Sequence, residues 1–173
     1  QARDAGRRLR GLIGPNGRCL CYVSPYVRTR QTLAHVLHEV VGDSAAEAER
    51  SPDYLAPYNP SVADVVDNAL AMLRLGPEHR LWDLGCGDGR LLVAACQRHG
   101  CRATGVEYDA KLAAASRRRA ADAGLADAIT VMHANVMDVD FSTARRMYLF
   151  LLPDGLKRLQ PKLHALLRAN DAA

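Results

Sequence analysis

The chain has 173 residues, of which 49% are hydrophobic and 24% charged, and its formal net charge is +4. This length and composition are typical of a folded globular protein with its own apolar core. No apolar run approaches the roughly 20 residues of a membrane-spanning helix, so the sequence predicts no membrane span. Aromatic residues make up only 5%, and the positive charge is modest, so we expect no nucleic-acid partner.

The chain divides into two parts joined by a linker. Within residues 1–41 we expect a helical start, a short apolar strand over 18–24 (RCLCYVS) and a helix over 28–41. Residues 42–53 are polar and small and include a proline, which is typical of a linker. We therefore predict a short αβα segment over 1–41, a linker over 42–53, and a domain over 54–173.

The second part alternates between helical and strand-like patterns. Apolar residues at helical spacing predict a helix over 61–75. Further along the chain, strands are expected at 80–84, 103–107, 129–133 and 147–152, with helices at 90–99, 110–123 and 153–169. Strands that alternate with helices of this length indicate βαβ units and a parallel, Rossmann-like α/β sheet.

A glycine-rich loop directly follows the first strand of this domain. The stretch LWDLGCGDGR places Asp83 just before Gly85, Gly87 and Gly89, and Glu107 ends the next strand 22 positions after Gly85. Glycines allow the backbone to turn tightly and to approach a ligand, and the following helix presents free N–H groups. A carboxylate at the end of the second strand is placed to bind ribose hydroxyls.

The loop does not match the pattern that binds NAD. That pattern is G-x-G-x-x-G, whereas Arg90 stands here where the third glycine would be. The carboxylate of Asp83 would also repel a pyrophosphate. A ligand with a ribose and a positive sulfonium or amino group suits the site better, and S-adenosylmethionine (SAM) has both.

The motifs DLGCGDGR and GVEYD resemble the first two motifs of class I SAM-dependent methyltransferases. The stretches PYNPS, ITVMHANVMDVDFS and YLFLLP extend the resemblance, over about residues 54–170, to a narrower group. That group comprises protein-lysine methyltransferases that act on adenine nucleotide carriers and ATP synthase c subunits, together with bacterial relatives. The resemblance implies SAM as the cofactor and a methyl acceptor as the partner, with a protein lysine as one candidate.

The resemblance also implies which residues hold the cofactor. Asp83 and Gly85 would hold its methionine part, and Glu107 its ribose. Asn135 stands where the family has an Asp that contacts the adenine amino group, and an amide oxygen can accept the same hydrogen bond. The remaining candidates are the close-approach glycines and an aromatic at the entrance: Gly87, Gly89 and Tyr58.

The sequence assigns no catalytic base, although Tyr148 on the YLFLLP strand is a weak candidate for the acceptor side. The usual fold of this family has seven strands, whereas the pattern here ends at about the fourth, so we expect an incomplete domain. A non-catalytic binding module with the same fold is therefore an alternative to an enzyme. We expect a cytoplasmic location, with a mitochondrial one as the alternative.

The N-terminal stretch SPYVRTRQT, residues 24–32, resembles a motif of the histidine phosphatase (phosphoglycerate mutase-like) superfamily. The resemblance would make Arg28 a phosphate-binding residue. The family's R-H-G triplet occurs only as Arg98–Gly100, where it closes a predicted helix of the other domain. We therefore expect a remnant, a fusion whose start is missing or an erroneous gene model rather than a phosphatase.

Other polar and sulfur-containing residues are better interpreted as structural. The five cysteines have no C-x-x-C spacing and are expected to be buried thiols in a reducing compartment. His35 and His38 have no third ligand near them in the sequence, so we expect no metal site. Arg117–Arg119 are expected to form a solvated helix face, and Asp88 is expected to order the glycine loop through backbone N–H groups.

Overall fold

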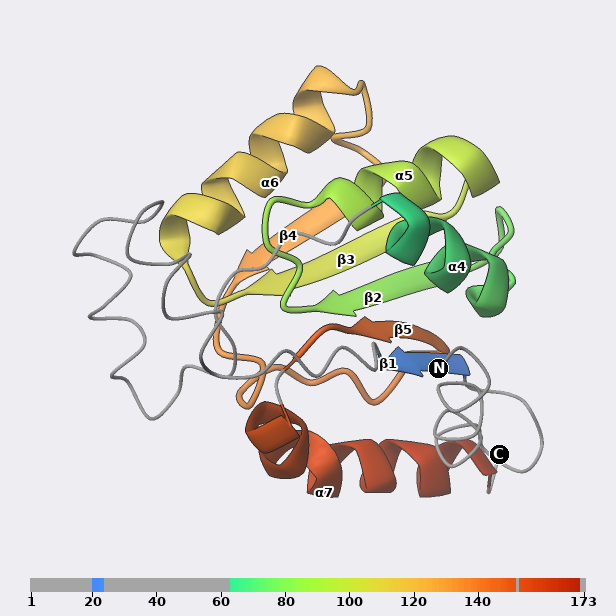
Figure 1. Ribbon diagram of the computed structural model, residues 1–173, viewed down its shortest axis with the longest axis vertical. Coiled ribbons are helices and arrows are strands. Elements are labelled where there is room, and N and C mark those ends of the chain that lie inside the picture. Colours follow the sequence, from blue (N-terminus) through green and yellow to red (C-terminus); the bar gives the residue numbers. More distant parts are fainter. Residues whose placement is uncertain (1–19, 24–62, 152, 172–173) are drawn as a thin grey trace.

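The computed structural model describes residues 20–23, 63–151 and 153–171. These residues form one parallel sheet with helices on both faces (Figure 1). Helices α4, α5 and α6 cover one face and α7 covers the other. Within the described parts of the chain no helix is long and apolar enough to span a membrane.

The element bounds agree closely with the predicted pattern. The strands are β1 (Leu20–Val23), β2 (Arg80–Leu84), β3 (Arg102–Glu107), β4 (Ile129–His133) and β5 (Arg146–Leu149). The helices are α4 (Ala63–Leu73), α5 (Arg90–His99), α6 (Ala110–Asp122) and α7 (Pro153–Asp171). The Rossmann-like parallel α/β fold is thus confirmed. The predicted linker and the predicted helix over 28–41 lie outside the described residues.

The strand order is β1-β5-β2-β3-β4, and every neighbouring pair is parallel. The chain moves outward from β2 through β3 to β4 and then returns to β5 on the other side of β2. This reversal creates a switch point between the carboxyl ends of β2 and β5, which is where open parallel sheets bind their ligands. The glycine loop follows β2 and therefore lies at this point.

The sheet has five strands, whereas the sequence predicted four in the second part of the chain. The fifth is β1, which pairs in parallel with β5 in the register Leu20↔Arg146 to Val23↔Leu149. The sequence analysis expected this strand but could not predict its partner, because local periodicity carries no information on which strand pairs with which. The N-terminal strand thus covers the edge of β5.

Two apolar clusters hold the layers together. On one face, α4 and α5 bury residues such as Leu70 and Leu92 against Leu81 of β2. On the other face, Leu159 and Leu163 of α7 pack against Met147 and Leu149 of β5. Both β2 and β5 therefore carry buried apolar residues on both sides, as buried parallel strands do, although β2 also contains Asp83. The glycine loop is consequently mounted on a well-packed part of the sheet.

Candidate functional site

The glycine loop adopts a backbone conformation that other residues rarely take. Gly85, Gly87 and Gly89 have φ angles of +93°, +54° and +76°, all in the left-handed region. A side chain at these positions would be strained whatever space surrounded it. The loop is also joined to β3, because the N–H groups of Gly85 and Cys86 both donate to the carbonyl oxygen of Val106 at 2.8 and 3.0 Å.

Glu107 touches the loop directly. Its Oε2 accepts a hydrogen bond from the Gly87 N–H at 2.7 Å, and its Oε1 accepts one from the Asp109 N–H at 2.9 Å. The side chain is buried at the carboxyl end of β3. Burial raises the pKa of Glu107, although these backbone N–H groups act in the opposite direction. A carboxylate held in this way has a fixed orientation, and each oxygen keeps a lone pair for a ligand.

Asp83 is a buried carboxyl group that is not fully paired. Only 2% of the residue is exposed, and its Oδ1 accepts no hydrogen bond from the described residues. Burial raises its pKa well above the usual range, and the negative charges of Glu107 and Asp88 raise it further. A buried carboxyl oxygen without a partner is costly, because it has lost its hydration without compensation. A cationic ligand is the kind of group that would offset this cost.

Asp88 lies at the centre of a charge cluster that orders the loop. Its Oδ2 accepts from Nη2 of Arg119 at 2.6 Å and from Nη2 of Arg90 at 2.9 Å. Burial acts to raise its pKa, but the hydrogen bonds and charge of Arg90 and the charge of Arg119 outweigh it, so that the pKa is lowered. The sequence predicts that Asp88 orders the loop through backbone N–H groups. One such group, that of Arg90, donates to Oδ1 at 3.3 Å, but the shorter bonds come from the arginine side chains.

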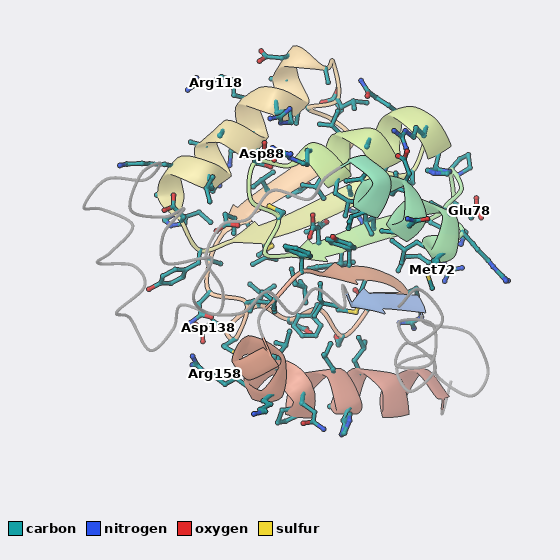
Figure 2. All side chains as sticks on the ribbon, viewed as in Figure 1. Met72, Glu78, Asp88, Arg118, Asp138 and Arg158 are labelled. Atoms are coloured by element: carbon teal, nitrogen blue, oxygen red, sulfur yellow. The ribbon has the colours of Figure 1, made fainter. Side chains whose placement is uncertain are left out.

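The residues Arg117–Arg119 are all exposed, as predicted, but two of them also bind other parts of the chain. Arg119 contacts Asp88, and Arg117 donates to the carbonyl oxygen of Val131 from Nε and Nη2 at 3.2 and 2.9 Å. Figure 2 shows Asp88 between α5 and α6, whereas Arg118 points outward from α6. The sequence alone does not show this difference, because the three arginines are consecutive and identical. Only the register of the helix, in which Ser116 and Arg119 share a face, separates them.

Asn135 follows β4 and is partly buried. Its Oδ1 accepts from the Met137 N–H at 2.9 Å, which forms a tight turn at this edge of the sheet. Tyr148 is opposite Asp83 in the β2–β5 register and is 2% exposed, within the apolar cluster under α4 and α5. Tyr58 and Arg28 lie outside the described residues, so the roles expected for them stay predictions.

Two residues near the site went unnoticed in the sequence. Tyr108, next to Glu107, is 39% exposed, and among the described residues only Tyr108 and Met72 are large hydrophobic residues with this much exposure. Lys162 of α7 donates from Nζ to the carbonyl oxygens of Met137 and Val139 at 2.6 and 2.9 Å. The first could have been found from its position after the strand-end acid. The second depends on contacts between distant segments, which no local pattern predicts.

Lys162 fixes the segment that carries Asn135. We expect Lys162→Met to lower the free energy of unfolding by about 1–3 kcal/mol, because two carbonyl groups lose a charged donor. Methionine keeps most of the apolar stem. Urea unfolding monitored by circular dichroism measures the change, with the exposed Gln160→Met as the control on the same helix. Equal stability of the two variants would contradict the role assigned to Lys162.

The thiol beside the glycine loop, that of Cys86, is unsuited to nucleophilic chemistry. Cys86, Cys96 and Cys101 are free and buried, as predicted. Burial raises the pKa of the Cys86 thiol, and the charges of Asp83 and Glu107 add to this effect, so the thiol is protonated at neutral pH. In the same part of the chain, no group of three or more His, Cys, Asp or Glu side chains is arranged to hold a metal.

Comparison with known proteins identifies a family. The model of the ANTKMT methyltransferase domain matches residues 83–172. A protein-lysine N-methyltransferase of Saccharolobus islandicus is 30% identical over 62% of this chain and 67% of its own length. The mouse adenine nucleotide translocase lysine N-methyltransferase is 33% identical over 63% of the chain. The Xenopus laevis lysine N-methyltransferase named for the ATP synthase C subunit is 34% identical over 68%. The chain spans 47% and 50% of the lengths of these two animal proteins.

Solved structures agree on the fold. An RNA methyltransferase from Salinibacter ruber, in complex with S-adenosyl-L-homocysteine, has a TM-score of 0.61 and 34% identity. The match covers 62% of this chain and 71% of that one. A SAM-dependent methyltransferase from Geobacter sulfurreducens, in complex with the same product, has a TM-score of 0.51 and 25% identity. This second match covers 65% of the chain and 45% of the Geobacter protein.

Proposed function

The chain belongs to the ANTKMT methyltransferase domain family, and on this premise we propose that it binds SAM at the glycine loop and transfers the methyl group to a protein lysine. SAM supplies a methyl group on a positively charged sulfur, which is already activated for displacement. The protein contributes binding, orientation and exclusion of water.

The single observation that carries the proposal is the buried carboxyl group of Asp83, with its unpaired Oδ1, beside a left-handed glycine loop. A phosphate-bearing cofactor would be repelled there, whereas the ammonium and sulfonium groups of SAM would offset the charge. A Cβ at Gly85 would lie 3.3 Å from Cδ2 of Leu151, so the loop leaves little room beside the segment that follows β5.

The proposed ribose and adenine contacts lie at the ends of β3 and β4. The fixed carboxylate of Glu107 would accept from the two ribose hydroxyls, as both oxygens retain accepting capacity. The exposed ring of Tyr108 offers an apolar face for the adenine. The Oδ1 of Asn135 already accepts one hydrogen bond and has a second lone pair for the adenine amino group.

The acceptor is proposed from the relatives. Several of them are named lysine N-methyltransferases, whereas the Salinibacter ruber protein is named an RNA methyltransferase. A lysine has an unperturbed pKa of about 10.4, so it must lose a proton before it attacks a methyl group. A dry acceptor site would favour the neutral amine, because desolvation lowers the pKa of a lysine.

Isothermal titration with SAM tests the cofactor. We expect Glu107→Gln to weaken SAM binding at least about tenfold. In the parent each of two backbone N–H groups donates to a different carboxylate oxygen, whereas the glutamine amide has only one oxygen that can accept. The exposed Glu78→Gln serves as the control. Unchanged affinity in Glu107→Gln, or no binding to the parent chain, would contradict the assigned site.

Transfer of labelled methyl groups tests the acceptor. The chain is incubated with labelled SAM and either protein or RNA from a cell extract, and acid hydrolysis of the protein fraction then identifies methyl-lysine. Label in lysine that disappears with Glu107→Gln supports the proposal. Label in RNA and not in protein would mean that the acceptor is RNA rather than a protein lysine. SAM binding without any methyl transfer would favour the non-catalytic alternative.

A further inference from the structure

Helix α6 holds the glycine loop at two points one turn apart. Gly89 packs so closely on α6 that a Cβ there would lie 2.2 Å from the Oγ of Ser116. Three residues further along, Arg119 reaches both polar parts of Asp88. Its Nε donates to the backbone carbonyl oxygen at 2.9 Å, and its Nη2 donates to Oδ2 at 2.6 Å. One guanidinium group therefore fixes both the peptide and the side chain of the same loop residue.

The same helix is tied to Glu107 at its other end. Asp109 caps α6 by accepting from the N–H groups of Lys111 and Leu112 at 2.7 and 2.9 Å. The Asp109 N–H donates to Glu107, which in turn accepts from the Gly87 N–H. The contacts thus form a closed ring from the loop through Glu107 and α6 back to the loop. Loss of any member would loosen the geometry of the others.

The guanidinium of Arg119 also balances charge. Asp88 lies close enough to Asp83 for its negative charge to raise the pKa of that carboxyl group. Arg90 and Arg119 supply the opposing positive charges. The side chain of Arg119 is 46% exposed, whereas that of Asp88 is 13% exposed. Arg119 therefore reaches in from the surface to a carboxylate that is largely removed from water, where a charged hydrogen bond is stronger.

We propose that Arg119 is a positioning residue, which acts through Asp88 to hold the glycine loop and Glu107 in the arrangement that binds SAM. This inference rests on the proposed function for its ligand, but the ring of contacts is independent of it. Arg119 does not touch the cofactor in this account. Its effect should therefore appear in SAM affinity and in loop mobility, and much less in the rate at saturating SAM.

The test compares Arg119→Ala and Arg119→Lys with Arg118→Ala in the full chain. Arg118 is the matched control because it is an exposed arginine on the same helix that points away from the loop. We expect Arg119→Ala to raise the Kd and KM for SAM about tenfold and to change kcat by less than about twofold. Arg119→Lys should recover only part of the affinity, because an ammonium group cannot form both bonds in the same planar geometry.

Two further measurements separate this inference from the proposed function. Hydrogen exchange without SAM should show faster exchange at the loop amides 85–90 in Arg119→Ala than in Arg118→Ala. In an Asp88→Ala background, which removes the carboxylate but keeps the backbone carbonyl oxygen, Arg119→Ala should raise the Kd clearly less than it does in the parent chain. Parent chain that does not bind SAM would overturn the function, and the exchange result would still test the ring. Unchanged loop exchange in Arg119→Ala would overturn the role of Arg119. So would an effect of Arg119→Ala on Kd that is as large in the Asp88→Ala background as in the parent chain.

Discussion

Asp83→Asn is expected to stabilise the protein without SAM and to weaken SAM binding about 10- to 100-fold. The stabilisation should be about 1–3 kcal/mol at neutral pH, because the substitution removes a buried carboxylate that has no hydrogen bond to Oδ1. The loss of affinity has the same origin, since the carboxylate is the group that a cationic ligand would need. One residue would thus lower stability while it supports binding.

The pH dependence follows from the raised pKa of Asp83. Between the unfolded pKa, about 3.9, and the folded one, the native chain binds the proton more tightly than the unfolded chain. Its stability therefore falls as pH rises through that window. The Asn variant lacks this slope, so the stability difference between variant and parent should be near zero below about pH 4 and grow as pH rises. Glu107 also has a raised pKa and remains in both proteins, so the cost of its own burial cancels, and the difference reports Asp83 together with its charge interaction with Glu107.

SAM affinity should rise with pH over the range in which the stability of the parent chain falls. A cationic ligand favours the ionised carboxylate, so binding would release a proton from Asp83, and the affinity of the parent should increase with pH through that titration. Affinity in Asp83→Asn should depend less on pH. Thermal unfolding and titration calorimetry over pH 4–8 provide both measurements, with the exposed Asp138→Asn as the control. A variant that is less stable than the parent at pH 7 would contradict the account.

Much of the site could be predicted because its residues lie close together in the sequence. The loop glycines, the acid before them and the acid at the end of β3 lie within about 25 residues. The ends of the helices could be predicted equally well from the sequence. Gly100 has φ +64° and its N–H donates to the carbonyl oxygen of Cys96, as expected for a glycine that closes a helix. Short-range spacing and backbone preference determine all of these features.

What escaped prediction depends on contacts between distant segments. Strand β1 pairs with β5 more than 120 positions later in the chain, and Lys162 reaches the loop before β5 from α7. The sequence offers no means to distinguish the arginines of α6. Arg119 differs from Arg118 only because the fold places Arg119 against the glycine loop. The charge cluster of Asp88 with Arg90 and Arg119 is for the same reason a result of the tertiary fold.

Gly89→Ala is expected to have the largest effect on stability of any single methyl group added at the site. Two costs combine. The φ of +76° strains any L-residue, and the new Cβ would lie 2.2 Å from Oγ and 3.2 Å from Cα of Ser116. The approach to the backbone carbon is the decisive one, because that atom is part of α6 and cannot rotate away. We expect a loss of about 3 kcal/mol and a fall of about 6–12 °C in Tm.

Gly124→Ala separates the two costs. Gly124 has a similar φ of +69°, but nothing among the described residues lies within 4 Å of a Cβ placed there. It should therefore show only the backbone cost, about 1–2 kcal/mol. The difference between the two variants in urea unfolding measures the close approach of the loop to α6. Relief of part of the Gly89→Ala loss by Ser116→Gly would confirm the contact, since that change removes Oγ and Cβ and leaves the backbone. Equal losses at Gly89 and Gly124 would mean that the loop is not pressed against α6, and the ring that joins the loop, Glu107 and Arg119 would then lose its closest contact.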